Sequence, residues 1–197
     1  MGEHAPWSPA AFEQRYASDA DPWSFATSTY ELDRYASILD ALRPEPYRYR
    51  FGYEPACSVG VLTTLLAPRC DTLVATDVSP SAVGQARKRC GLRTGLSVEV
   101  GSVQDGPPGD DGPDLVVFSE LGYYFTELEL AAIVGRIGRR MAPGGDLVAC
   151  HWTGESADHQ LGAATVHDVL GRTLAPIALS MGGEVHDGFL LDAWRLS

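Results

Sequence analysis

Short apolar segments rich in β-forming residues alternate with helical patterns along most of this chain, and this alternation limits the folds it can adopt. The predicted buried strands are residues 73–76, 96–100, 115–118 and 147–150. The predicted helices between them are residues 61–66, 81–90 and 128–141. Strands and helices in this order form parallel sheets whose crossover helices are right-handed. We therefore expect an α/β protein with a doubly wound sheet, in which Ser79 and Pro80 begin the second of these helices as its cap and first turn.

The last quarter of the chain follows a different pattern. Residues 165–174 can form a helix, and residues 177–180 and 189–196 can form strands separated by Gly182 and Gly183. Because no helix connects these two strands, they should pair as an antiparallel hairpin. A mostly parallel, Rossmann-like sheet that ends in such a hairpin resembles the class I methyltransferase architecture and differs from the all-parallel nicotinamide-binding sheet.

The segment before the first strand has a helical character of its own. Helical stretches lie around residues 9–16 and 30–42, with Asp21, Pro22 and Trp23 between them. At 197 residues the chain fits one domain. We expect a single methyltransferase domain over residues 1–197, with a helical lid or extension at 1–45 and a cofactor-binding α/β core at 50–197.

Charge and composition argue against several kinds of partner. The net charge of −11 does not suit a nucleic acid, whose binding depends on phosphate neutralisation. No apolar stretch approaches the roughly 20 residues of a membrane span, and no secretory signal is visible. The four cysteines are scattered, and His159, His167 and His186 have no partners at metal-ligand spacing. We therefore expect a cytoplasmic protein with free thiols, no metal and a small-molecule partner.

The most informative motif is the run EPACSVGVLT at residues 54–63, followed about twenty residues after its turn by Asp77. A nucleotide-like cofactor requires a tight turn of small residues between strand and helix, which lets the backbone approach it closely. It also requires an acid after the second strand to accept both ribose hydroxyls. Ala56, Ser58 and Gly60 hold the small positions, and Asp77 is the acid. Only one of the three is glycine, so the loop alone is also compatible with a core strand and an ordinary turn.

These residues, taken with two other parts of the chain, resemble the nodulation protein S (NodS) family. The named members of this family are class I N-methyltransferases that methylate the free amine of a deacetylated chitooligosaccharide. The resemblance extends from about residue 12 to the C-terminus. It is carried by residues 21–23, 30–35, 54–63 and 65–80, by His151-Trp152 and Val166-His167, and by residues 190–194.

The chain departs from the family pattern at two neighbouring positions. Ala56 replaces the first glycine of the loop, which we expect to be tolerated only if the backbone there has no positive φ. Pro55 cannot donate to a sheet, so it should lie at the end of its strand, where the chain leaves the sheet.

The resemblance implies S-adenosylmethionine as the cofactor and suggests how it is held. Asp77 is expected to bind the ribose, with Val78 against the adenine, and Glu54 to order the loop and receive the amino group. Arg34 is the candidate for the carboxylate, because the family's N-terminal segment folds over the cofactor and a guanidinium can bind a carboxylate as a fork. A helix-surface role for Arg34 and a core role for Trp23 are the alternatives. The other implied cofactor residues are Trp23, Ala56, Ser58, Gly60, Ser102, Val103 and Ser119, with Ser102 where the family more often has Asp.

The acceptor side is predicted from the ends of the fourth and fifth strands, which meet at the carboxyl edge of the sheet. An amine must arrive deprotonated, and a nearby acceptor helps to remove its proton. Glu120 and His151 are the two candidates for this catalytic role, and both should point into one cleft. Tyr123, Tyr124 and Trp152 could wall the substrate pocket and stabilise the sulfonium. The alternatives are a structural histidine and ordinary packing aromatics.

Together these observations predict an S-adenosylmethionine-dependent methyltransferase that N-methylates an amine of a sugar, a glycoside or another small metabolite. The main alternative is an O-methyltransferase with His151 as its base. A non-catalytic subunit that binds the cofactor is a third possibility, suggested by Ala56, and a nicotinamide oxidoreductase is a distant fourth.

Overall fold

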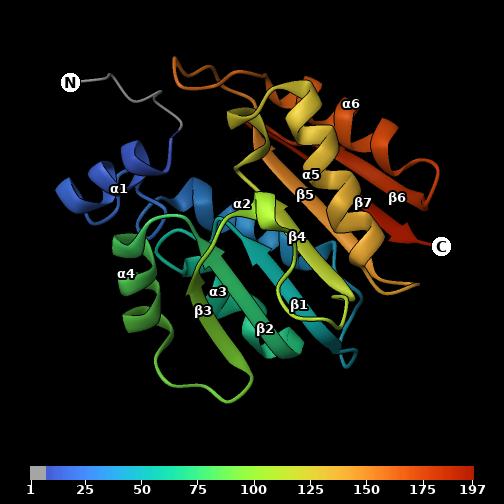
Figure 1. The fold of residues 1–197 in the computed structure, drawn as a ribbon, viewed down its shortest axis with the longest axis horizontal. Coiled ribbons are helices and arrows are strands. Elements are labelled where there is room, and N and C mark those ends of the chain that lie inside the picture. The colour runs from blue at the N-terminus through green and yellow to red at the C-terminus, as the bar shows by residue number, and fades with distance from the viewer. Residues whose placement is uncertain (1–7) are drawn as a thin grey trace.

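The computed structural model describes residues 8–197 and contains one seven-stranded sheet (Figure 1). The strands lie in the order β3-β2-β1-β4-β5-β7-β6. Strand β7 is antiparallel to β5 and β6, and the other neighbours are parallel. The predicted doubly wound sheet with a C-terminal hairpin is confirmed. The strands are β1 Tyr49–Pro55, β2 Cys70–Asp77, β3 Leu96–Val100, β4 Leu115–Ser119, β5 Asp146–Trp152, β6 Ala178–Val185 and β7 Phe189–Leu196.

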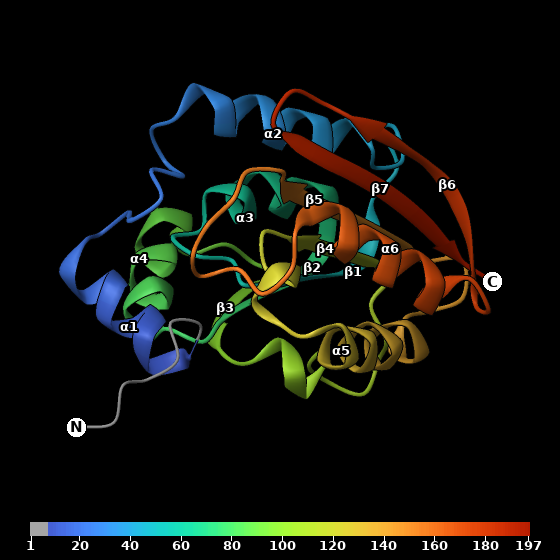
Figure 2. The same cartoon turned by 90° about the horizontal axis from the view of Figure 1, so that it is seen from above.

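Helices cover both faces of this sheet (Figure 2). Helices α2, α3 and α4 pack on one face, and α5 and α6 pack on the other. The helices are α1 Pro9–Ser18, α2 Thr29–Asp40, α3 Val61–Leu66, α4 Pro80–Cys90, α5 Glu127–Arg140 and α6 Ala163–Leu174, with 3₁₀ turns η1 Ala67–Arg69, η2 Val103–Asp105 and η3 Gly122–Tyr124.

The central strands are buried on both sides, as a doubly covered sheet requires. Along β4, Val116 and Phe118 contribute to the core under α5 and α6, whereas Leu115 and Val117 contribute to the core under α2 and α3. The same alternation runs along β5. It follows that a side chain at the end of these strands points to one face or the other according to its parity, that is, whether it occupies an odd or an even position along the strand.

The start of α4 is the one that the sequence predicts. The hydroxyl of Ser79 accepts a hydrogen bond from the backbone N–H of Ala82 at 3.1 Å, and Pro80 occupies the first turn. Pro55 is the last residue of β1, as predicted, so its missing N–H leaves the ladder intact.

The hairpin turn does not lie where the sequence analysis put it. Gly182 and Gly183 belong to β6, which continues to Val185, and the chain reverses over residues 186–188. A bulge between Ser180 and Gly182 explains the two glycines, because Gly182 has a φ of +112° that other residues rarely adopt.

The N-terminal extension contains the two predicted helices, and its first seven residues lie outside the described part of the chain. Helix α1 lies beside α4 in both views (Figures 1 and 2). Glu13 joins them, because its carboxylate accepts hydrogen bonds from the hydroxyls of Ser79 and Ser81, both at 2.6 Å. An acid at the start of α4 also suits the positive end of that helix.

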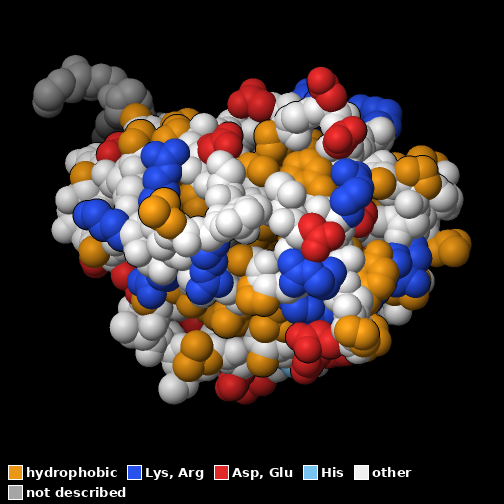
Figure 3. Space-filling model, turned by 90° about the horizontal axis from the view of Figure 1, so that it is seen from below, with side chains coloured by type: hydrophobic (Ala, Val, Ile, Leu, Met, Phe, Trp, Pro, Cys, Tyr) orange, Lys and Arg blue, Asp and Glu red, His pale blue; other side chains and the backbone are white. Residues whose placement is uncertain are grey.

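Basic and acidic side chains lie next to one another on the face drawn in Figure 3. Within residues 8–197, none of the helices has the length and apolar character that a membrane span needs. The same residues contain no group of three potential metal ligands.

Candidate active site

A cavity of about 760 Å³ opens between α1 and the carboxyl ends of the parallel strands. Ligands of open α/β sheets bind at this edge, and the volume is that of a site for a small molecule or cofactor. The predicted site residues that line it are Trp23, Ala56, Ser58, Asp77, Val78, Ser102, Val103, Glu120, Tyr123, Tyr124 and Trp152. A small second hollow adjoins it, because Phe25, Ala56, Ser58 and Glu120 line both.

Asp77, at the end of β2, is fixed by backbone groups on both sides. Its Oδ2 accepts the N–H of Ser58 and its Oδ1 accepts the N–H of Ser79, both at 2.9 Å. Burial, only partly offset by these bonds, raises the pKa of the carboxyl group to about 6. Each carboxylate oxygen can accept a second hydrogen bond, so Asp77 can still bind a pair of hydroxyls in the cavity.

The loop after β1 is more strained than the sequence suggests. The condition on which we expected Ala56 to be tolerated, a backbone without positive φ, is not met, since its φ is +57° and that of Ser58 is +52°. The conformation is held by hydrogen bonds, because the N–H of Cys57 donates to the carbonyl of Thr76 at 2.9 Å and Ser58 donates to Asp77. Left-handed residues other than glycine cluster at functional sites, where the surroundings over-determine them.

Gly60 does not line the cavity, and its role is in packing. A Cβ atom at this position would lie 2.8 Å from the Cβ of Ala86 in α4. With a φ of +78°, Gly60 also provides the left-handed cap from which α3 begins. Gly60 therefore lets the start of α3 approach α4 closely.

The far end of the cavity is formed by Val78, Ser102 and Val103, which follow β2 and β3. The hydroxyl of Ser102 accepts the N–H of Gln104 at 3.2 Å and so caps the η2 turn. Trp23 also lines the cavity, half-buried, and stacks on Phe25 with ring centroids 5.9 Å apart. The structure thus brings these predicted residues to the same cavity as Asp77.

Glu54 lies at the end of β1 and lines the small second hollow. It is 3% exposed, and its Oε2 has no hydrogen-bond partner among the described residues. Burial raises the pKa of this carboxyl group to about 8, against an opposing effect of the Thr63 hydroxyl and with a smaller increase from the charge of Asp77. A buried carboxyl oxygen without a partner is costly unless a ligand supplies one, so a cationic group fits this hollow well.

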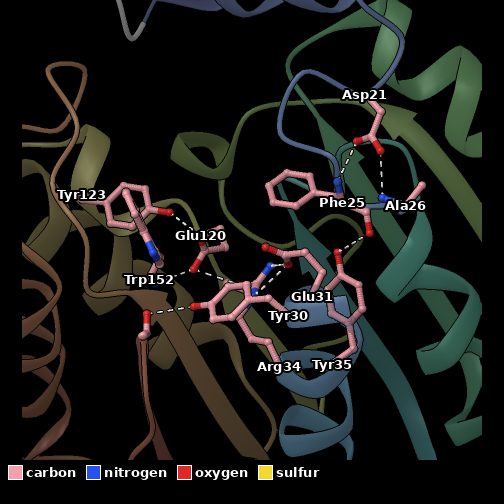
Figure 4. A network of polar contacts seen from close by, with 12 residues as sticks. Asp21, Phe25, Ala26, Tyr30, Glu31, Arg34, Tyr35, Glu120, Tyr123 and Trp152 are labelled. Atoms are coloured by element: carbon pink, nitrogen blue, oxygen red, sulfur yellow. Dashed lines mark hydrogen bonds and ion pairs between the residues drawn. The ribbon is translucent and has the colours of Figure 1, made fainter. Parts of the chain in front are cut away.

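Arg34 also lines the small hollow, but its guanidinium is already engaged (Figure 4). Its Nε and Nη2 donate to Oε2 of Glu31, and its Nη1 donates to the hydroxyl of Ser119 at 2.8 Å and lies 3.3 Å from Oε1 of Glu120. These contacts leave little of the guanidinium for the carboxylate of the cofactor, the partner that the sequence analysis assigned to it. Arg34 is 1% exposed and pairs with the buried Glu31 and the partly exposed Glu120.

Glu120 is the best-connected side chain of the cavity (Figure 4). Its Oε2 accepts the hydroxyl of Tyr123 at 2.5 Å, and its Oε1 accepts the backbone N–H of Trp152 at 2.7 Å. Glu120 follows β4 with a φ of +59°, a conformation that costs roughly 1–3 kcal/mol in a residue other than glycine. This turn directs the carboxylate into the cavity between η3 and α2.

His151 does not point into the cleft that we expected it to share with Glu120. It is fully buried and lines neither hollow, because its parity in β5 turns it toward α6. Its Nε2 accepts the N–H of Gly122 at 3.1 Å, and its Nδ1 lies 3.1 Å from Nε2 of His167. Burial, followed by the charge of His167, lowers the pKa of His151 well below its usual value.

Several lining residues escaped the sequence analysis. Phe12 and Tyr16 project from one face of α1 at i and i+4, and Tyr16 donates to the hydroxyl of Ser58 at 2.6 Å. This spacing could have marked a cavity-facing side of the helix. His159 stacks on Tyr123 with centroids 3.7 Å apart, but it lies in the connection between β5 and α6, where no sequence pattern identifies it.

The charged residues that line the cavity are all acidic, and Arg34 beside it pairs with two of them, Glu31 and Glu120. Of the described residues that line it, none is Lys or Arg. The acidic lining residues are Glu31, Asp77, Glu120, Glu129 and Glu155. Such a site attracts cationic ligands and repels anions.

Comparison with solved structures assigns this fold to the class I methyltransferases that use S-adenosylmethionine. The crystal structure of the N-methyltransferase NodS from Bradyrhizobium japonicum WM9 with S-adenosyl-L-homocysteine superimposes with a TM-score of 0.80 at 25% identity. The match covers 95% of this chain and 97% of that one. A DhpI complex with S-adenosylhomocysteine matches with a TM-score of 0.73 at 22% identity, over 100% and 99% of the two chains.

The chain belongs to the nodulation protein S (NodS) family, whose model matches residues 11–184. It is 32% identical over 166 residues to nodulation protein S of Rhizobium tropici, covering 80% of this chain and 67% of the relative. It is 30% identical over 169 residues to the protein of Bradyrhizobium diazoefficiens, covering 84% and 79%. The protein is therefore an enzyme, an S-adenosylmethionine-dependent methyltransferase. The alternatives of a non-catalytic subunit and an oxidoreductase are set aside.

Proposed function

We propose that this enzyme N-methylates the amine of a small acceptor such as an amino sugar. The observation that carries the proposal is the charge of the cavity, which contains five carboxylate side chains and no Lys or Arg among its described lining residues. An amine enters such a site as a cation, whereas a neutral hydroxyl gains nothing from its charge. The match to a structure named as an N-methyltransferase, and to nodulation protein S at about one-third identity, supports the same acceptor chemistry.

The cofactor is assigned to the side of the cavity nearest β1 and β2. Asp77 is suited to the ribose hydroxyls and Glu54 to the amino group, because each has a buried carboxyl oxygen free to accept a further hydrogen bond. Val78, Ser102 and Val103 are assigned to the adenine. When bound, S-adenosylmethionine supplies a methyl group activated by its positively charged sulfur.

The acceptor is assigned to the side nearest β4 and β5, where Glu120 faces the cavity. A carboxylate there can accept a hydrogen bond from the amine and orient the nitrogen lone pair. The amine would bind as an ammonium ion and lose one proton through Glu120 to solvent. Its lone pair would then form the new N–C bond to the methyl group as the S–C bond breaks, with that bond's electrons left on the sulfur of S-adenosylhomocysteine. Tyr123, Tyr124 and Trp152 form aromatic walls that exclude water and favour a cationic group.

Hydroxyl methylation remains the second candidate because a histidine does reach the cavity. This is His159, half-buried against Tyr123, rather than His151. Burial lowers the pKa of His159, although Glu120 and Asp158 oppose the effect, and a neutral imidazole can serve as a base.

A matched acceptor panel distinguishes the two functions. Methyl-labelled S-adenosylmethionine is supplied with glucosamine or deacetylated chitobiose and, as hydroxyl-only counterparts, with glucose or N-acetylglucosamine. Label on the amines and none on the counterparts is expected. Transfer to glucose or N-acetylglucosamine at equal or higher rates contradicts the proposal.

Glu120→Gln tests the catalytic assignment without changing the shape of the side chain. Its turnover of the preferred amine should fall by roughly 10²-fold or more, the usual contribution of a positioned acid–base group. Glu155→Gln is the control, because Glu155 is an exposed acid that also lines the cavity. If both variants lose activity equally, overall charge rather than Glu120 is responsible.

A further inference from the structure

A chain of polar groups lies directly behind the acceptor side of the cavity, and it is buried except at its outer end, Asp192. It begins at the backbone N–H of Gly122, which donates to Nε2 of His151 at 3.1 Å. Nδ1 of His151 lies 3.1 Å from Nε2 of His167, and Nδ1 of His167 lies 2.5 Å from Oδ2 of Asp192. The chain connects η3, β5, α6 and β7, and it contains none of the residues assigned to the cofactor.

The chemistry of the two ends fixes where the protons lie. Because a backbone N–H can only donate, Nε2 of His151 must be unprotonated. A neutral imidazole then carries its proton on Nδ1, which donates to Nε2 of His167. His167 in turn must carry a proton on Nδ1, which the carboxylate of Asp192 accepts. One arrangement of protons therefore satisfies all three contacts.

The turn held by this chain carries a side chain of the acceptor site. Gly122 begins η3, and the next residue, Tyr123, donates its hydroxyl to Glu120. The imidazole of His151 packs edge-on against Tyr123, with ring centroids 5.4 Å apart. A Cβ atom on Gly122 would lie 2.9 Å from Nε2 of His151, so glycine is needed for the ring to approach the turn.

We propose that His151, held in a single tautomer by His167 and Asp192, is a positioning residue that fixes η3 so that Tyr123 meets Glu120. The inference rests on the proposed role of Glu120 toward the acceptor. It gives His151 a function without contact with substrate. The opposite tautomer places an N–H of His151 against the N–H of Gly122, so the turn has to move and Tyr123 leaves Glu120.

Two variants interrupt this series of hydrogen bonds at Asp192, which does not line the cavity. Asp192→Ala removes the acceptor for His167. Gly183→Ala leaves every titratable group in place, but its new Cβ would lie 1.8 Å from Oδ1 of Asp192 and must displace that carboxylate. Asp187→Ala is the matched control, because it removes an exposed acid from the turn of the same hairpin.

Nitrogen-15 spectra of the histidines and hydrogen exchange at Gly122 report on the chain without an acceptor. The wild type and Asp187→Ala should show His151 protonated on Nδ1 and a protected Gly122 amide. Asp192→Ala and Gly183→Ala should show a mixed or reversed tautomer and faster exchange at Gly122. With deacetylated chitobiose, kcat should fall roughly 10- to 100-fold, as expected for loss of a supporting hydrogen bond. Affinity for S-adenosylhomocysteine should not change.

The proposal is overturned if wild-type His151 is protonated on Nε2, or if both variants lower only the melting temperature and leave the tautomer and the Gly122 exchange unchanged. A failure of the proposed function looks different. In that case Glu120→Gln keeps the wild-type rate, or deacetylated chitobiose is not methylated at all. The nitrogen-15 spectra and the hydrogen exchange at Gly122 still test the role of His151, because neither needs an acceptor.

Discussion

Binding of the cofactor product should release a proton from Glu54. Burial gives this carboxyl group a pKa of about 8, so at pH 7 roughly nine in ten free molecules hold it protonated. A cationic amino group beside it favours the ionised form. S-adenosylhomocysteine should therefore release roughly 0.9 proton at pH 7 and about 0.1 at pH 9. Its affinity should increase by roughly fivefold between pH 7 and pH 8.

Titration calorimetry in phosphate and in Tris measures this release, because the two buffers differ in their enthalpy of protonation. Glu54→Gln should abolish most of the release at pH 7. It should also weaken binding by roughly 10- to 100-fold at pH 8, because a hydrogen bond to a charged group contributes about 1.5–3 kcal/mol. Glu99→Gln, an exposed glutamate of β3, is the control. Equal proton release by the wild type and Glu54→Gln would refute the assignment of Glu54.

The free enzyme offers a second check of the same pKa. Since the folded-state pKa of Glu54 is raised above its ordinary value of 4.5, its contribution to stability is fully present below pH 4.5. It is lost as the pH increases toward about 8, by about 1.4 kcal/mol per pH unit at most. The free energy of unfolding of Glu54→Gln, measured with urea, should vary less over this range than that of the wild type.

Other predictions concern the cofactor side of the cavity and residues 23–35 of the N-terminal extension. Asp77→Ala should lower the affinity for S-adenosylhomocysteine by well over tenfold, because two charge-assisted hydrogen bonds of roughly 1.5–3 kcal/mol each are lost, whereas Asp71→Ala at the exposed start of β2 should not. The cofactor product should protect residues 23–35 from hydrogen exchange, and unchanged exchange would mean that this segment only packs on the core. Ala56→Gly should keep wild-type affinity while Ala56→Val loses it, since a β-branched residue at a φ of +57° is strongly disfavoured; equal binding by both would contradict the strain argument.

The sheet could be predicted because its signals are local. Buried strands, helix caps and the absence of a helix before β7 are all visible within short windows, and they determine strand direction and layer order. The hairpin turn was misplaced because two glycines suit a β-bulge and a turn equally well. Only the pairing of β6 with β7, including the irregularity beside Gly182, distinguishes the two.

The cofactor side of the cavity could be predicted because it depends on backbone position. Asp77 ends β2, Val78 follows it and Ser102 comes just after β3, and the carboxyl ends of parallel strands meet at one edge. His151 was misplaced because its position along the strand was considered without its parity, which turns the side chain toward α6. The pairing of Arg34 with Glu31, three residues earlier on α2, could have been predicted from the sequence, whereas its contact with Glu120 from beyond β4 is a property of the folded chain.

Glu120 connects the N-terminal extension to the proposed acceptor site, because the groups that hold it come from both. The guanidinium of Arg34, on helix α2 of the extension, lies 3.3 Å from one of its oxygens, and the hydroxyl of Tyr123 and the N–H of Trp152 belong to the core. Without Arg34 the carboxylate would lose the guanidinium that joins it to Glu31 and Ser119, and only its contacts with the core would remain. Docking of the N-terminal extension therefore does more than line the cavity, since it also helps to hold the proposed catalytic carboxylate in place.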